Sequence, residues 1–194
     1  MNYLRWALLF VVFTAVGFLG NSGVWGQTTP TPQKASAPLT LYTNSVEQVS
    51  FLVPSPWNFK ELNQKGEGYF LCAGESRPLK DPTEPFAESL NLVVSDLPST
   101  LTPAQFLDDY TKNLTTSLKE LKVEKKGEVS GANTLGKYLI YSHQHPSVAP
   151  RVKSLVFLFV NKDKGYALSC TSTAVNYPSY EEIFRSIGKS FKFN

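Results

Sequence analysis

The chain has 194 residues, with 19 basic and 16 acidic side chains and a formal net charge of +3. This near balance lacks the basic stripe of nucleic-acid-binding proteins, and we expect no nucleic-acid partner. The densest basic stretch, residues 119–126, mixes lysines with glutamates, which is typical of a solvated surface.

The N-terminus, residues 1–26, has the order of a secretory signal peptide. A short basic segment precedes an apolar run over residues 6–19, and Val24 and Gly26 stand at the −3 and −1 positions of a cut before Gln27. The alternative is a retained membrane anchor, although a span usually needs about 20 residues. In either case we expect an exported domain in a periplasmic, lumenal or secreted location, and the anchor would keep it at the membrane.

Residues 27–40 are rich in threonine and proline and hold almost no large apolar side chain. This composition cannot form a packed core and predicts a flexible tether. Residues 41–194 follow, a length that suits one domain with a single core.

The first half of this domain contains four runs that predict strands. They are residues 49–53, which two prolines end, and residues 57–62, 68–73 and 89–94. Three prolines between the third and fourth runs predict a loop.

The periodicity then changes to that of a helix over residues 103–121. Thr102 and Gln105 have the spacing of a capping box, and Pro103 suits the first helical position. One apolar face follows at three- and four-residue steps, made by Phe106, Leu107, Tyr110, Leu114, Leu118 and Leu121.

The second half returns to strands. Residues 122–130 predict a polar edge strand, residues 136–142 another strand, and the very apolar residues 153–160 a central one. A hairpin turn over residues 161–165, with a positive φ expected at its glycine, leads into a strand over residues 166–172.

A final helix is expected near the C-terminus. Ser179 and Glu182 predict its capping box, and Gly188 predicts its end. Its apolar face would consist of Tyr180, Ile183, Phe184 and Ile187.

This order of elements resembles the PsbP-like superfamily of PsbP- and DcrB-like exported domains. The phrases that carry the resemblance are residues 49–54 with Trp57, then 90–94, 101–106, 135–138, 165–169 and 180–191. The resemblance implies an α+β fold, an αβα sandwich with a central antiparallel sheet and helices on both faces. It also implies a non-enzymatic role in binding, assembly or envelope maintenance.

The two histidines of the chain, His143 and His145, could both reach one Zn or Cu ion, because side chains at i and i+2 of an extended segment share a side. Two ligands do not close a site, no third ligand is evident, and Pro146 indicates a loop. A surface pair of histidines is the competing interpretation, and no metal or other cofactor is expected.

The two cysteines, Cys72 and Cys170, are the pair expected to form a disulfide, because an even count in an exported chain favours a bridge. Two buried free thiols are the alternative.

No motif recommends an enzyme. A Gly-x-Ser-x-Gly elbow and a glycine-rich phosphate loop are both missing from the sequence, and Asp108 and Asp109 are neighbours that diverge on a helix. We therefore expect no catalytic residues.

Trp57 and Phe59 follow two prolines and are candidate anchors for a partner, together with Arg77 at the start of the proline-rich segment 77–85. The sequence thus predicts an exported, non-catalytic domain that binds an unidentified protein partner in the assembly or maintenance of an envelope or membrane complex. The alternative is a small-ligand or metal carrier that uses His143 and His145.

Overall fold

A computed structural model of the protein describes residues 37–55, 57–60, 64–66, 69–76, 86–98, 100–146 and 151–194. The predicted signal peptide or anchor, most of the predicted tether and the segment 77–85 with Arg77 lie outside these residues. Among the described helices, none has the length and hydropathy needed to cross a membrane.

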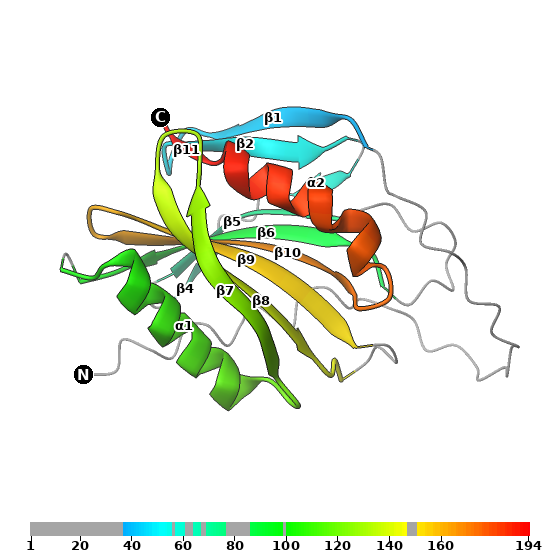
Figure 1. Ribbon diagram of the computed structural model, residues 1–194. Coiled ribbons are helices and arrows are strands. Elements are labelled where there is room, and N and C mark those ends of the chain that lie inside the picture. The colour runs from blue at the N-terminus through cyan, green and yellow to red at the C-terminus, as the bar shows by residue number, and fades with distance from the viewer. Residues whose placement is uncertain are drawn as a thin grey trace, which may run out of the picture.

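Within the described residues, two antiparallel sheets and two helices form the fold (Figure 1). The strands are β1 (Leu39–Asn44), β2 (Val49–Pro54), β3 (Asn58–Lys60), β4 (Gln64–Gly66), β5 (Tyr69–Ser76), β6 (Ser89–Asp96), β7 (Lys122–Ser130), β8 (Leu135–His143), β9 (Val152–Asn161), β10 (Lys164–Thr173) and β11 (Lys192–Phe193). The helices are α1 (Pro103–Ser117) and α2 (Tyr177–Ser190). The larger sheet has the order β3-β5-β6-β10-β9-β8-β7, with β4 also paired to β5, and the smaller has the order β1-β2-β11.

The larger sheet is covered on both faces, which confirms the expected α+β sandwich. Helix α1 contacts β8 and β9 on one face, whereas α2 and the small sheet lie on the other (Figure 1). Strand β9 is central, as predicted, and is apolar because both of its faces are buried. Phe157 and Phe159 belong to the core under α2, whereas Val156 and Leu158 belong to the core under α1.

The capping box of α1 is confirmed. Thr102 Oγ1 accepts a hydrogen bond from the Gln105 amide at 3.3 Å, and the Thr102 amide donates to Gln105 Oε1 at 2.9 Å. The helix ends at Ser117, before the predicted end at residue 121, because Leu118 adopts an extended backbone and Glu120 has a φ of 52°.

The predicted limits of α2 are wrong at both ends. The helix begins two residues before Ser179, with Asn176 as an N-cap whose side chain makes no capping hydrogen bond. At the other end, Gly188 lies inside the helix and is buried. A Cβ at Gly188 would overlap the ring of Phe157, so the glycine is there for close packing rather than for a helix stop.

The expected strands each correspond to an observed strand, and β1, β4 and β11 are additional. Strand β1 begins at Leu39, inside the stretch expected to be tether, because it pairs antiparallel with β2. The second expected strand corresponds to β3, Asn58–Lys60; Trp57 precedes it, and the expected residues 61–62 lie outside the described residues. In the β9–β10 turn, Lys162 rather than Gly165 has the positive φ, at 55°. Gly165 instead leaves room for the ring of Phe106, 2.8 Å from where a Cβ would stand.

The expected disulfide between Cys72 and Cys170 is not formed. Cys170 is a free, buried thiol. The sheet order gives the physical reason. Cys72 is on β5 and Cys170 on β10, and β6 pairs with both strands and therefore separates them. Two strand spacings amount to about 9.5 Å, beyond the roughly 7 Å limit between the Cα atoms of a disulfide.

Candidate functional site

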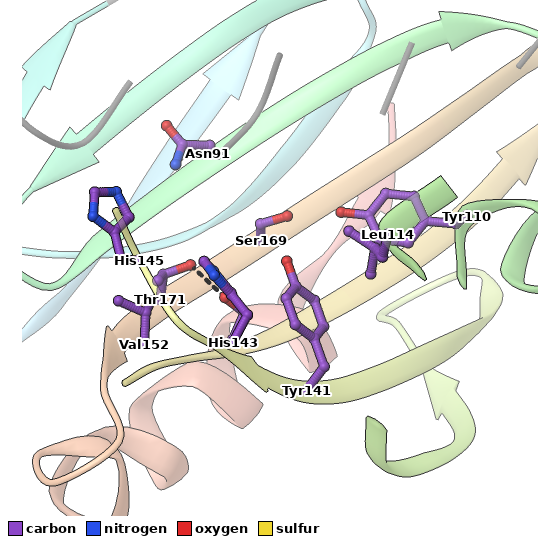
Figure 2. A pocket seen from close by; sticks show the side chains of 10 residues that line it. Asn91, Tyr110, Leu114, Tyr141, His143, His145, Val152, Ser169 and Thr171 are labelled. Carbon is purple, nitrogen blue, oxygen red and sulfur yellow. Dashed lines mark hydrogen bonds between the residues drawn. The ribbon is translucent and has the colours of Figure 1, made fainter. Parts of the chain in front are cut away.

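A small polar pocket opens on the α1 face of the larger sheet. Its volume is about 30 Å³, which is room for about two water-sized groups. The pocket is lined by Asn91, Tyr110, Leu114, Tyr141, His143, His145, Val152, Ser154, Ser169 and Thr171 (Figure 2). Only Leu114 and Val152 among these are apolar, although the same sheet face is apolar under the first turns of α1.

The register of the sheet brings these polar side chains into rows. Tyr141 of β8 lies opposite Ser154 of β9, and Ser154 lies opposite Thr171 of β10. In the neighbouring row, Ser169 of β10 lies opposite Asn91 of β6. Paired residues of antiparallel strands point to the same face, so four strands contribute to one surface.

Hydroxyl groups form a connected network at the base of the pocket. Ser154 Oγ and Thr171 Oγ1 are 3.0 Å apart, Tyr141 is hydrogen-bonded to Ser154 and Tyr110, and Tyr110 also to Ser169. Figure 2 shows both tyrosine hydroxyls pointing toward Ser169. Burial raises the pKa of Tyr110, and that of Tyr141 well above its ordinary value, so both phenols stay protonated and neutral.

Three aromatic rings of one chain segment form a wall of the pocket. The ring centroids of Tyr141 and His143 are 6.0 Å apart with an interplanar angle of 30°, and those of His143 and His145 are 6.4 Å apart. The two imidazoles therefore do share a side, as predicted. They are not a surface pair, because His143 is only 3% exposed and His145 only 6%.

His143 has an unusual electrostatic environment. Its Nδ1 is buried and has no hydrogen-bond partner. Burial lowers the pKa of His143, a hydrogen bond with the Gln144 backbone opposes this, and electrostatic interactions with His145 and Arg151 lower it further. His143 is consequently a neutral imidazole with one unused nitrogen.

The arrangement does not form a closed metal site. Across the described residues, no group of three His, Cys, Asp or Glu side chains is placed to hold a metal ion. The two imidazoles could offer an ion at most two ligands, and structural zinc requires four.

Among the described side chains, the predicted site residues Trp57 and Cys170 do not line this pocket. Trp57 is half-buried and packs against the core under α2. Phe59 lies on β3, where its backbone pairs with Glu75, and nothing is described of its side chain. Cys170 is fully buried, and burial raises the pKa of its thiol, which makes it a poor nucleophile.

Sequence reasoning missed the non-histidine lining residues, above all Ser154, Ser169 and Thr171. A signal does exist in β10, where Ala167, Ser169 and Thr171 alternate with the more apolar Tyr166, Leu168 and Cys170. A small-polar alternation within an otherwise apolar strand marks a face that is not fully packed. Only the register shows that Ser154 and Tyr141 continue the same face.

Comparison with known proteins identifies the family. The PsbP family model matches residues 37–193, which is nearly all of the folded domain. The chain belongs to the PsbP family. No curated protein sequence matches the chain significantly.

Solved structures show how widely this PsbP fold is shared. Cyanobacterial PsbP (CyanoP) from Synechocystis sp. PCC 6803 has a TM-score of 0.56 and 15% identity, covering 89% of this chain and 98% of its own. LpqN of Mycobacterium tuberculosis, involved in cell envelope biogenesis, has a TM-score of 0.55 and 12% identity, covering 84% and 90%. The Ran-binding protein Mog1p of Saccharomyces cerevisiae has a TM-score of 0.53 and 11% identity, covering 81% and 96%. At these identities the likeness is one of fold.

Proposed function

We propose that this chain is an exported PsbP-family domain that acts by binding a protein partner, not by catalysis, in the assembly or maintenance of an envelope or membrane complex. The observation that carries the proposal is the PsbP match over residues 37–193, which follows residues 1–26, the segment with the order of a signal peptide or anchor, after a short intervening stretch. The involvement of the structural neighbour LpqN in cell envelope biogenesis agrees with this role.

The chemistry of the described site supports a binding role. The pocket offers hydroxyls, an amide and imidazoles, and neither a carboxylate nor a thiol lines it. General acid–base catalysis most often uses His, Asp or Glu, and of these residue types the pocket lining contains only His143 and His145. The two phenols are held neutral by burial, so neither is poised as a base at physiological pH.

For the partner surface we keep Trp57, Phe59 and Arg77 as the proposed anchors. The test is affinity capture of the full chain from membranes of its own host, followed by reconstitution with the captured protein. Alanine replacements of the three residues should weaken binding of that protein by at least about tenfold, the size expected for one hot-spot side chain. Val175→Ala is the matched control, because Val175 is 64% exposed and lies in the turn between β10 and α2.

Two results would remove this proposal. Unchanged affinity in the triple variant would reject the surface. If no protein of a membrane or envelope complex binds the purified chain, the function itself fails. The same preparation tests export, since a processed chain should begin at Gln27 and an anchored chain should retain residues 1–26 in the membrane fraction.

The pocket favours a second candidate function, that of a small-ligand or metal carrier. The specific observation is that His143 and His145 are both buried in one pocket and that His143 Nδ1 has no partner. Calorimetric titration with zinc and with copper tests the metal version. Heat that disappears in a His143→Ala/His145→Ala variant supports it, and heat unchanged by the double substitution removes it.

A further inference from the structure

The α1 face of the sheet has more hydrogen-bonding atoms than it uses. His143 Nδ1 and Ser89 Oγ are both buried without a hydrogen-bond partner. Ser89 lies opposite Thr171 in the register, so it extends the row of Tyr141 and Ser154 on the same face. An unpaired buried polar atom costs about 1–3 kcal/mol, so the unpaired Nδ1 of the pocket residue His143 indicates a missing partner in the pocket.

The pocket is built for a neutral group. No Lys, Arg, Asp or Glu is among its lining residues. Arg151 is the nearby cation, but its guanidinium is engaged by Glu120 Oε2 at 3.2 Å and by the backbone oxygens of Glu120 and Ser142. A charged ligand would therefore lose its hydration without gaining an opposite charge, which is strongly unfavourable.

Size and shape restrict the ligand further. A volume of about 30 Å³ accommodates about two heavy atoms, such as two hydroxyl oxygens, of a ligand whose remainder extends through the open side. The wall of Tyr141, His143 and His145 offers flat ring faces, whereas Ser169, Thr171 and Asn91 offer polar atoms on other sides (Figure 2).

We propose that this pocket binds a small neutral molecule through adjacent hydroxyl groups, that is, a polyol or the diol edge of a sugar. Each hydroxyl both donates and accepts, which matches a lining of serine, threonine and tyrosine hydroxyls, an amide and a neutral imidazole. One hydroxyl of the ligand would form the hydrogen bond that His143 Nδ1 lacks, and the adjacent ligand hydroxyl would form a hydrogen bond with Thr171 or Asn91. This inference rests on the small-ligand version of the second candidate function and names its ligand class.

The experiment uses the fact that the chain has only two histidines. With the full-length chain labelled with ¹⁵N-histidine, the imidazole spectrum contains the signals of His143 and His145 alone, and a His143→Gln variant assigns them. Glycerol and methyl glucoside are the probes, with acetamide, acetate and zinc as separate arms. We expect both hydroxyl probes to shift the His143 signals saturably, at about 1 mM for groups this small.

Matched variants locate the binding. Thr171→Val keeps the side-chain shape, removes one hydroxyl and should weaken glycerol binding about fivefold, the value of one hydrogen bond. Thr43→Val is the control, because Thr43 is exposed on β1 of the small sheet, away from the pocket. Asn91→Ala is a second variant, from another strand, in case Thr171→Val disturbs folding.

Three outcomes would overturn the proposal. A glycerol shift that stays linear, or that both pocket variants leave unchanged, would show non-specific solvation. Saturable shifts with acetamide or acetate but with neither hydroxyl probe would assign a different ligand class. Saturable shifts with zinc alone would leave a metal carrier standing while rejecting the polyol, so the two failures are distinguishable.

Discussion

At the scale of single residues, His143 shows how position changes the chemistry of a side chain. The same imidazole on a surface loop would titrate near its ordinary pKa of 6.5. At the end of β8 it is 3% exposed, beside His145 and near Arg151, and burial lowers its pKa. The residue therefore contributes hydrogen bonding rather than charge at neutral pH.

We predict from this pKa that acidification destabilises the fold through His143. The folded-state pKa lies below the unfolded value of 6.5, so the unfolded chain binds the extra proton first. The free energy of unfolding is then fully present above about pH 6.5 and falls as the pH drops through the window below it. Urea unfolding midpoints between about pH 8 and about pH 5 measure this effect.

The control is His143→Phe, which keeps a ring beside Tyr141 but cannot titrate. The variant should lose the part of the pH dependence that lies just below neutrality and keep the carboxylate part at lower pH. An identical slope in the variant and the parent would assign the effect to other groups. His145 is the other histidine present, and His145→Phe distinguishes it.

At the scale of elements, types and order were predictable from the sequence, but several ends were not. The predicted start of α1 was correct because Thr102 and Gln105 form a capping box, a local interaction that needs no tertiary contact. The predicted limits of α2 failed because the helix begins at the buried Tyr177, two residues before Ser179, and because Gly188 serves close packing against Phe157 and not a helix stop. Strand β1 was missed because its sequence, LTLYTN, becomes a strand through pairing with β2.

Gly188 provides the test of that packing argument. In an ordinary helix interior, Gly→Ala adds about 1 kcal/mol of stability. In α2 the new methyl would overlap the ring of Phe157, so Gly188→Ala should instead destabilise the protein by about 1–3 kcal/mol. Urea unfolding of the parent and variant measures the change.

A double-mutant cycle gives this prediction its control. Phe157→Leu removes part of the ring that meets residue 188, so the Gly188→Ala/Phe157→Leu chain should be more stable than the sum of the two single effects. Lys189→Ala, on the exposed side of the same turn, should change little. Simple additivity of the two core changes would show that Gly188 and Phe157 are not coupled.

At the scale of the whole molecule, the features that depend on strand order and register could not be predicted from the sequence. The order of strands and helices followed from patterns in the sequence, whereas the antiparallel sandwich was what the resemblance to the PsbP-like superfamily implied. The pocket did not, because each of Ser154, Ser169 and Thr171 is an ordinary strand residue until the register places it beside Tyr141. The histidine pair was visible at i and i+2, but its burial depends on α1 and on neighbouring strands.

The sheet order also leads to a prediction about the two cysteines. Because β6 lies between β5 and β10, Cys72 and Cys170 cannot bridge without breaking the central pairing of the larger sheet. We therefore expect the native mass to be unchanged by reduction. Both thiols should react with an alkylating reagent when the chain is unfolded without reductant, whereas Cys170 should stay protected in the folded chain, where it is fully buried. A Cys72→Ser variant, which leaves Cys170 alone, should show the same protection; alkylation of the unfolded parent only after reduction would contradict the sheet order.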